Sequence, residues 1–145
     1  MQIIDGKDLV LGRLASYVAK RALSEDKETF NIINAENIVI SGSKKMVLDR
    51  YKFLVEVGDI YKGPFISRMP DRLFRRAVKG MLPMNTTRGR EAFKRIMAYI
   101  GESELKGTKV SSKDLEKFHK KNLKDQKYVL LKDLSELIGM KIKNR

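Results

Sequence analysis

Apolar residues recur at helical spacing near the start of the chain. From Leu11 to Ala22 they fall every three or four positions, while Arg13, Lys20 and Arg21 lie outside the apolar stripe. Such spacing is typical of an amphipathic helix with one face on the core. The pattern therefore predicts a helix from Leu11 onward.

A second helix is predicted after Ser41-Gly42-Ser43. Ser43 is a suitable N-cap residue, because its hydroxyl can accept a hydrogen bond from a free backbone N–H of the first turn. The apolar residues that follow at helical spacing are Val47, Tyr51, Leu54 and Val55. They predict one face of this helix against the core.

Short runs rich in isoleucine and valine predict β-strands around these helices. The runs are Gln2–Asp5, Thr29–Asn34, Asn37–Ile40 and Lys127–Leu131. Strands that alternate with helices indicate an α/β fold whose sheet is covered on both faces.

Two further helices are predicted near the end of the chain. The segment Ser111–Asn122 is highly charged, so we expect a helix that packs only weakly. A short helix over Asp133–Ile138 would end at Gly139, a residue suited to the left-handed conformation that closes helices.

The chain is expected to be one domain that spans residues 1–145, since 145 residues fit a domain of ordinary size. Proline and glycine cluster from Gly58 to Pro83, which predicts an extended or insertion-like region rather than a linker between domains. The absence of cysteine excludes disulfides and zinc–thiolate sites. The N-terminus lacks a signal-peptide pattern, and no apolar run approaches the roughly 20 residues that span a bilayer. We therefore expect a cytoplasmic protein with no membrane segment.

The net charge of the chain is the strongest indication of its partner. Lys and Arg number 31 against 18 acidic residues, a formal charge of +13. An excess of this size favours a polyanionic partner, because phosphate contacts release condensed counterions. Nucleic acid is the first candidate and an anionic membrane surface the second; composition alone does not separate RNA from DNA.

Most of that excess lies between Lys62 and Arg95. This segment holds 10 basic and 2 acidic residues, so it carries +8 of the +13. Arginine dominates, and its planar guanidinium fits phosphate oxygens and can stack on bases.

Within this segment, Pro70 and Asp71 are typical of a helix start. The predicted helix places four cations on one face, at positions i, i+3, i+4 and i+7: Arg72, Arg75, Arg76 and Lys79. Phe74, Ala77 and Met81 fall on the opposite face, flanked by Leu73 and Val78. A solvated surface face is the ordinary interpretation of such a stripe. Here it is disfavoured, because four cations without an interleaved acid repel one another.

A further amphipathic helix is predicted after Arg88-Gly89-Arg90, with Phe93, Ile96 and Ile100 facing inward. Gly89 either lets the backbone approach a phosphate closely or is an ordinary turn glycine. Tyr61 and Phe65 either stack on bases or, as we favour, pack in the core or anchor the loop.

Residues that would carry catalysis are sparse. His119 is the sole histidine, and it lies in a lysine-rich run without a matching carboxylate, so a solvated surface role is expected. Ser41-Gly42-Ser43-Lys44 lacks the upstream glycine of a phosphate-binding loop and is better interpreted as a helix cap. The acidic residues form no tight cluster in the sequence that would suit magnesium. We expect no enzyme, no cofactor, no metal site and no small-molecule substrate.

Short motifs follow one another in order from Gln2 to Gly101. They are Asp5-Gly6-Lys7, Leu11-Gly12-Arg13-Leu14-Ala15-Ser16, Asn34-Ala35-Glu36-Asn37-Ile38, Ile40-Ser41-Gly42, Gly63-Pro64, Arg68-Met69-Pro70-Asp71-Arg72, Gly80-Met81-Leu82-Pro83, Arg88-Gly89-Arg90 and Tyr99-Ile100-Gly101. As an ordered series they resemble the ribosomal protein L-thirteen family of the large subunit. The stretch from Arg88 to Arg95 is more similar to the archaeal and eukaryotic branch, and the long helical extension of eukaryotic members does not follow, so an archaeal type is expected. From Leu105 onward the resemblance fades, and the roles of the last residues rest on pattern alone.

The resemblance implies a three-layer α/β/α domain around a mainly parallel or mixed sheet of about four strands, with a basic helical and loop extension. It implies binding to large-subunit rRNA, a role in subunit assembly, and neighbours among other large-subunit proteins. The family's RNA-contacting loop and helix correspond to Gly63–Pro83 here, within the loop and helices that we expect to bind RNA at about 58–100. The predicted RNA-binding residues are Lys7, Arg13, Lys44, Lys45, Arg50, Lys62, Arg68, Arg72, Arg75, Arg76, Lys79, Arg88, Arg90, Lys94 and Arg95.

Two other functions stay open at this point. An enzyme that acts on RNA or nucleotides could use the same α/β scaffold, although fold alone confers no function. A regulatory protein that binds messenger RNA away from the ribosome is the other alternative.

Overall fold

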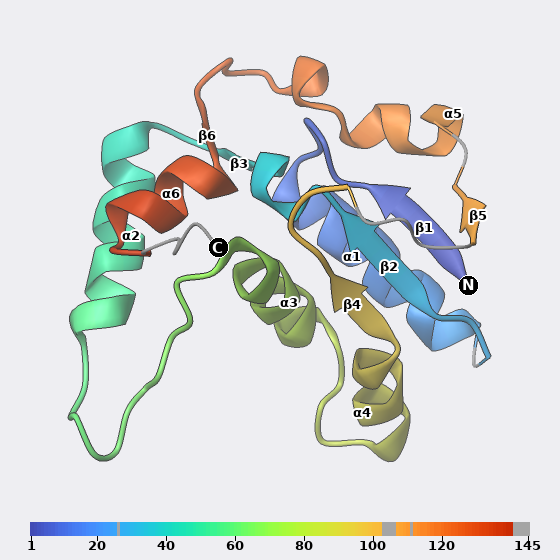
Figure 1. Ribbon diagram of the computed structural model, residues 1–145, viewed down its shortest axis with the longest axis horizontal. Helices are drawn as coiled ribbons and strands as arrows, with labels where there is room; N and C mark the ends of the chain where they lie inside the picture. Colours follow the sequence, from blue (N-terminus) through green and yellow to red (C-terminus); the bar gives the residue numbers. More distant parts are fainter. Residues whose placement is uncertain (26, 103–106, 111, 141–145) are drawn as a thin grey trace.

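A computed structural model describes residues 1–25, 27–102, 107–110 and 112–140 (Figure 1). Its main sheet has four strands in the order β4-β2-β1-β5, and every neighbouring pair is parallel. The strands are β1 (Gln2–Asp5), β2 (Phe30–Ile33), β4 (Ile96–Ala98) and β5 (Thr108–Lys109). The predicted α/β class and the mainly parallel sheet of about four strands are confirmed.

The central strand β2 is buried along its whole length. Phe30 and Ile32 belong to the main apolar core, and Asn31 and Ile33 are buried on the other face. A strand covered on both faces is expected at the centre of a parallel sheet. Of the predicted strands, Gln2–Asp5 is confirmed to the residue, whereas Thr29–Asn34 is shorter by one residue at each end. β4 and β5 were not predicted.

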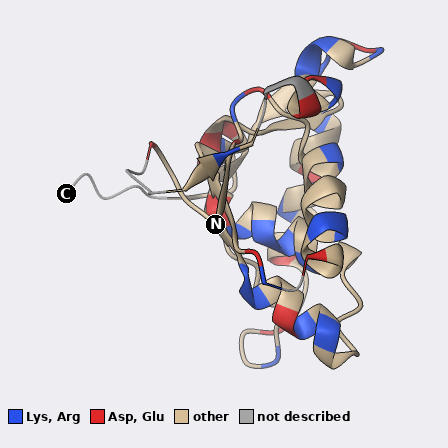
Figure 2. Cartoon of the chain, turned by 90° about the vertical axis from the view of Figure 1, so that its right-hand side faces the viewer, with Lys and Arg blue, Asp and Glu red and all other residues tan. Residues whose placement is uncertain are grey.

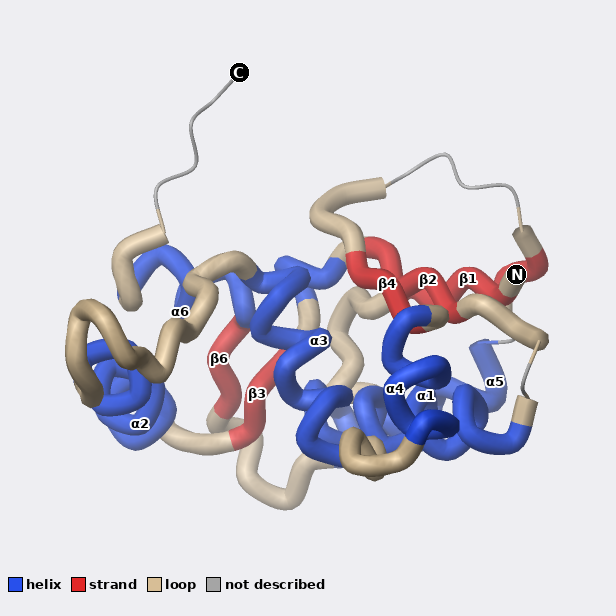
Figure 3. The backbone as a smooth tube through the Cα atoms, turned by 90° about the horizontal axis from the view of Figure 1, so that it is seen from below, coloured by secondary structure: helices blue, strands red, loops and turns tan. Residues whose placement is uncertain are grey.

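Helix α1 (Leu11–Ser24) begins where the apolar pattern predicted. Its buried residues are Leu11, Leu14, Ala15, Val18, Ala19 and Ala22, the predicted stripe. The stripe packs against α3 (Pro70–Met81) and α4 (Thr87–Lys94). Figure 3 shows α1 and α4 together on one side of β1, β2 and β4.

A second, smaller sheet lies beside the main one. Its strands β3 (Val39–Ser41) and β6 (Tyr128–Leu130) pair antiparallel. The predicted strand Asn37–Ile40 therefore begins later than expected, because Asn37 belongs to a 3₁₀ turn over Ala35–Asn37. Similarly, Leu131 leaves the predicted strand Lys127–Leu131 and opens helix α6 (Leu131–Leu137).

Helix α2 (Lys44–Glu56) flanks this second sheet (Figure 1). Ser43 caps it as predicted, since its hydroxyl accepts a hydrogen bond from the Met46 N–H at 3.4 Å. Val47 is buried, and Tyr51, Leu54 and Val55 are half-buried, so the predicted face is confirmed.

The helix predicted after Arg88-Gly89-Arg90 is shorter than its apolar spacing indicated. α4 ends at Lys94, Arg95 caps it, and Ile96 starts strand β4. Ile96 is buried as a strand residue, whereas Ile100 is exposed. The spacing of Phe93, Ile96 and Ile100 thus spans a helix, a strand and a loop.

The segment predicted as one helix over Ser111–Asn122 is broken, and Ser111 itself lies outside the described residues. It consists of α5 (Ser112–Leu115) and two 3₁₀ turns, Glu116–Phe118 and Lys120–Asn122. Glu116, Lys117, Lys121 and Asn122 are exposed, in keeping with the weak packing that was expected, although two apolar residues do pack. Leu115 is buried, and Phe118 lies against Tyr17 with ring centroids 5.2 Å apart.

No helix in the described part of the chain is long and apolar enough to cross a membrane.

Candidate nucleic-acid interface

Helix α3 carries the predicted cationic stripe. Pro70 occupies its first turn and Asp71 lies beside the N-terminal end of the helix dipole, as expected of a helix start. Leu73, Phe74 and Val78 are buried and anchor the helix against α1, β4 and α6. Met81, predicted on the inner face, is instead exposed, because it lies in the last turn where the helix leaves the core.

The four cations of this stripe differ in burial. Arg72, Arg76 and Lys79 are exposed, whereas Arg75 is half-buried. The Arg75 guanidinium carbon lies 4.9 Å from the centre of the Phe93 ring, a cation–π contact between α3 and α4. Arg75 is therefore held in place, while the other three remain free to follow a ligand.

A groove of about 290 Å³ runs along this face of α3. It is lined by all four cations together with Phe65, Ser67 and Phe93. Phe93, which we predicted to face inward, is half-buried and contributes to this groove as well as to the core. No acidic residue belongs to the described lining, so the groove suits an anion.

The loop between α2 and α3 forms the other side of the groove. It runs out from the body and back, as Figure 1 shows at the lower left. At its tip the backbones of Asp59 and Gly63 exchange hydrogen bonds of 3.2 and 2.9 Å, and the Tyr61 N–H donates to the Asp59 carboxylate at 3.3 Å. The region predicted from Gly58 to Pro83 thus begins with a closed hairpin turn and ends in helix α3, so only the part before Pro70 is a loop.

Aromatic side chains at this tip are exposed. Tyr61 is 88% exposed and Phe65 is 76% exposed, so core packing is wrong for both, while loop anchoring and base stacking stay open. Ile60 is 86% exposed beside them. Three large exposed apolar side chains within one short loop are unusual for a solvated segment and are typical of a contact surface.

The charges of Arg50 on α2 and Arg76 on α3 both act on the Tyr51 hydroxyl. Burial raises the pKa of the Tyr51 hydroxyl above its ordinary 10.0, and the positive charges of Arg50 and Arg76 oppose that rise. Both arginines are exposed. Two predicted site residues from different helices therefore lie around one tyrosine.

Two arginines of the α4 region contact the C-terminal end of α1. An Arg88 guanidinium N–H donates to the Leu23 carbonyl at 2.6 Å. Arg95 is half-buried, and its guanidinium donates to the carbonyls of Ala22 at 2.9 Å and Glu25 at 2.5 Å. A cation at this position also complements the helix dipole. These internal contacts give both residues a structural role beside the predicted RNA contact.

Gly89 lies inside α4 and is buried, so it is no turn glycine. A Cβ atom added there would lie 2.1 Å from the Pro83 carbonyl oxygen. The close approach that this glycine permits is to the chain's own backbone.

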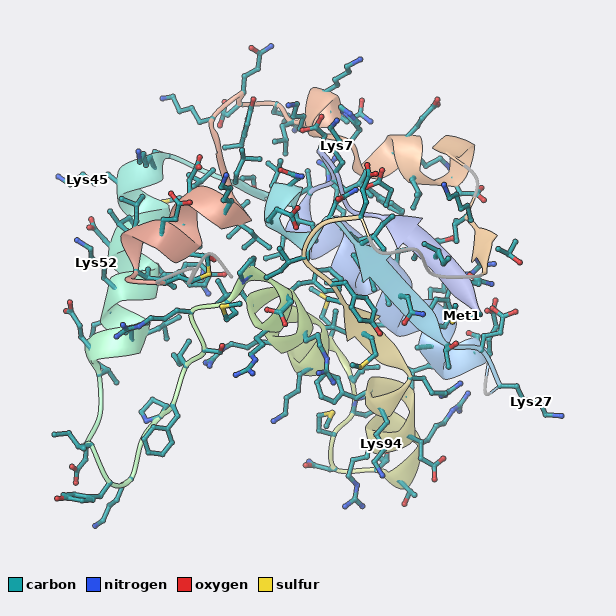
Figure 4. The ribbon with its side chains drawn as sticks, viewed as in Figure 1. Met1, Lys7, Lys27, Lys45, Lys52 and Lys94 are labelled. Carbon is teal, nitrogen blue, oxygen red and sulfur yellow. The ribbon has the colours of Figure 1, made fainter. Side chains whose placement is uncertain are left out.

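The remaining predicted cations lie on several faces. Lys62, Arg68, Arg90 and Lys94 are exposed on the loop, the start of α3 and α4. Figure 4 shows Lys7 and Lys45 on the opposite side of the molecule from Lys94. Lys44 and Lys45 are exposed at the start of α2, and Arg13 lies 3.4 Å from the carbonyls of Lys117 and Asn122. Figure 2 shows the same spread of basic residues over the fold, with fewer acidic ones between them.

Chemistry for catalysis or metal binding is sparse in the described residues, which hold no group of three or more His, Cys, Asp or Glu suited to a metal ion. His119 accepts a hydrogen bond at Nδ1 from the Lys121 N–H at 3.2 Å, and its ring is half-buried rather than fully solvated.

Fold and site together define a basic α/β protein with a cationic groove along one helix. The chain belongs to the ribosomal protein L13 family, whose model matches residues 1–105. It is 43% identical over 143 residues to large ribosomal subunit protein uL13 of Methanopyrus kandleri, a match that covers 94% of this chain and 86% of the relative. The corresponding proteins of Methanosarcina barkeri and Archaeoglobus fulgidus are 41% and 40% identical, and cover 97% and 96% of this chain and 99% and 88% of their own lengths. The archaeal resemblance is confirmed, and the similarity continues past Leu105, where the motifs had faded.

Proposed function

We propose that this protein is a structural component of the large ribosomal subunit that binds large-subunit rRNA and supports subunit assembly. Residues 1–145 would form one domain of this component, and the loop and helices at about 58–100 would meet the RNA. The protein would act in the cytoplasm, on the ribosome, beside other large-subunit proteins. We propose no catalytic role, cofactor or small-molecule substrate for it.

The observation that carries the proposal is the groove along α3. Four cations from one helix face, of which Arg72, Arg76 and Lys79 are exposed, line it without an acidic residue in the described lining. Charges arranged this way repel one another until an anion neutralises them. RNA phosphates supply such charges at regular spacing, and membership of a large-subunit protein family makes rRNA the natural source.

The other predicted cations would contribute less to RNA binding than the groove residues do. Lys62, Arg68, Arg90 and Lys94 extend the groove's field along the loop and α4, while Lys7, Arg13, Lys44, Lys45 and Arg50 lie on further faces. A protein embedded in folded RNA meets phosphates on more than one side, so separate basic surfaces fit this role. Arg88 and Arg95 would contribute least, because their guanidinium groups already bind carbonyls of α1.

The test compares two variants of equal charge. Arg72, Arg76 and Lys79 are replaced by Ala in one; in the other, three exposed lysines away from the groove, Lys20, Lys27 and Lys132, are replaced by Ala. Both lose three positive charges, and none of the six side chains is buried. We expect the first variant to bind large-subunit rRNA at least tenfold more weakly than the second. Equal affinities would contradict the site assignment.

A further inference from the structure

We propose that the groove along α3 binds one unpaired RNA base, stacked between Phe65 and the Arg75 guanidinium, while Arg72, Arg76 and Lys79 hold the flanking phosphates. This inference rests on the proposed function and specifies the form of RNA that the groove takes. It predicts recognition of single-stranded nucleotides in a loop or bulge rather than of a continuous duplex.

The first observation is the chemistry of the lining. A site that binds only phosphates needs cations, yet Phe65 and Phe93 also line this groove. Base recognition in single-stranded RNA commonly combines aromatic or guanidinium planes with a cationic track for the backbone. Both parts occur here within about 290 Å³, close to the lower end of pockets that enclose small ligands, roughly 300–1,000 Å³. The volume suits one nucleobase better than a stretch of duplex.

The second observation is the state of Arg75. One side of its guanidinium is occupied by the Phe93 ring, whose centre lies 4.9 Å from the guanidinium carbon. Its Nε is buried and has no hydrogen-bond partner among the described residues. The guanidinium is therefore fixed in orientation by packing rather than by an acidic residue. Arg75 also lines the groove, and a guanidinium plane is a surface on which RNA bases stack.

The third observation concerns Phe65. A side chain of this size, 76% exposed, gains nothing from the core. It follows directly on the hairpin closed by Asp59 and Gly63, and its ring lines the groove. The loop thus places an exposed aromatic ring at the cationic groove, where a base can stack on it.

The test uses two RNA probes of equal length and charge. One is a short single-stranded oligoadenylate, and the other is an abasic oligonucleotide with the same sugar–phosphate backbone. The measured quantity is the ratio of their affinities, determined by fluorescence anisotropy. Stacking of one base on an aromatic side chain corresponds to roughly a 5- to 100-fold difference in affinity.

We expect Phe65→Ala to lower this ratio by roughly 5- to 100-fold. Arg75→Lys, which keeps the charge but removes the planar guanidinium, should lower it in the same direction. The matched control is Phe53→Ala, since Phe53 is 64% exposed on α2 and does not line the groove. That control should leave the ratio unchanged. A ratio that is the same in Phe65→Ala, Arg75→Lys and the unaltered chain would overturn the proposal.

A direct readout follows from the absence of tryptophan in the chain. Phe65→Trp introduces a single indole at the groove, and Phe53→Trp introduces one away from it. Stacking should quench the Phe65→Trp emission when oligoadenylate binds, but not when the abasic probe binds to the same occupancy. Equal quenching by both probes, or by neither, would overturn base stacking.

Failure of the inference is distinguishable from failure of the proposed function. One outcome is that the triple variant, with Arg72, Arg76 and Lys79 replaced by Ala, binds both probes more weakly while the Phe65 variants change nothing. The groove then binds phosphates, and the base site is refuted. If that triple variant binds both probes as tightly as the charge-matched control with Lys20, Lys27 and Lys132 replaced, the RNA site on α3 is refuted, and the base site with it.

Discussion

Gly89 and Gly80 both lie in helices, but they face different surroundings. A Cβ atom at Gly89 would lie 2.1 Å from the Pro83 carbonyl oxygen, a backbone atom that cannot move aside cheaply. At Gly80 a Cβ atom would meet nothing within 4 Å. In the sequence both are simply glycines of the basic segment from Lys62 to Arg95, so this difference could not be predicted.

The glycine pair gives a prediction with its own control. Gly89→Ala should destabilise the protein by about 1–3 kcal/mol, because α4 must shift away from Pro83. Gly80→Ala should instead stabilise it by about 0.5–1 kcal/mol, since alanine loses less backbone entropy in a helix. Urea unfolding of both variants measures these changes. Equal effects of the two substitutions would contradict the described packing of α4.

Arg95 was predicted as an RNA-binding residue and also has a structural role in the fold. It was predicted as an RNA contact from charge alone, yet its guanidinium donates to the carbonyls of Ala22 and Glu25. Charge counts in a sequence cannot separate a cation that closes a helix from one that faces a ligand, because both are basic residues near other basic residues.

Replacing this arginine should therefore cost stability. We expect Arg95→Ala to lower the free energy of unfolding by about 1–2 kcal/mol, the range for hydrogen bonds to a charged donor that is partly solvated. Arg90→Ala, at an exposed position of α4, should change it by less than about 0.5 kcal/mol. Thermal unfolding of the two variants measures these changes. If Arg95→Ala is as stable as the unaltered protein, the structural role of Arg95 is contradicted.

Among the elements, the electrostatic influence of α3 on α2 can be measured through Tyr51. Burial raises the pKa of its hydroxyl, while Arg50 and Arg76 favour the phenolate. Removing the charge of Arg76 should therefore raise this pKa further. An ultraviolet titration of phenolate absorbance, with Tyr51→Phe as the baseline, resolves the group. Arg90→Ala serves as control. A pKa of Tyr51 that does not respond to Arg76→Ala would contradict the influence of the Arg76 charge on this hydroxyl.

The same shift makes stability depend on pH in the alkaline range. Below the ordinary pKa of 10.0 the hydroxyl is neutral in both states, so its contribution is fully present. Above that value the unfolded chain ionises first, and the contribution is lost as pH rises through the folded pKa. Tyr51→Phe should lose this part of the alkaline decline. If the free energy of unfolding of Tyr51→Phe depended on pH as that of the unaltered protein does, burial of the Tyr51 hydroxyl would be contradicted.

Helices whose apolar or charged pattern repeats over several turns were predictable from the sequence, whereas short strands were not. The stripe from Leu11 to Ala22 and the cationic stripe of α3 extend over several turns, so chance alignment is unlikely and both helices were placed correctly. Strands β4 and β5 have three and two residues, too few for alternation to be seen. At the break between α4 and β4, Arg95 contacts α1, a part of the chain that is distant in sequence.

The candidate site was predictable in part for the same reason. Helical spacing placed Arg72, Arg75, Arg76 and Lys79 on one face, and the structure brings them to one groove. The contribution of Phe65 and Phe93 could not be predicted, because Phe65 reaches the groove through the hairpin and Phe93 through the packing of α4 on α3. Whether an aromatic side chain is buried or exposed depends on such contacts, which pattern alone does not show.

At the scale of the whole molecule, the charge of +13 predicts strongly salt-dependent RNA binding. Each neutralised phosphate contributes a slope of about −0.7 to a plot of log affinity against log salt for single-stranded RNA. Replacing Arg72, Arg76 and Lys79 by Ala should make that slope shallower by about 2, roughly three times this value. Affinity measured across a salt series gives the slope directly. A slope unchanged by the triple substitution would mean that these side chains do not neutralise phosphates.

The central claim is that the cations of α3 hold this protein in the large ribosomal subunit. The most direct measurement is sedimentation of cell lysate on a density gradient, after a moderate and then a high salt wash, with cells that express the tagged protein, the triple variant of Arg72, Arg76 and Lys79, or the charge-matched variant of Lys20, Lys27 and Lys132. We predict that the unaltered protein and the charge-matched variant stay with the large subunit through both washes, while the triple variant is shed. A triple variant that stays bound through the high salt wash, or an unaltered protein found mainly free, would contradict the account.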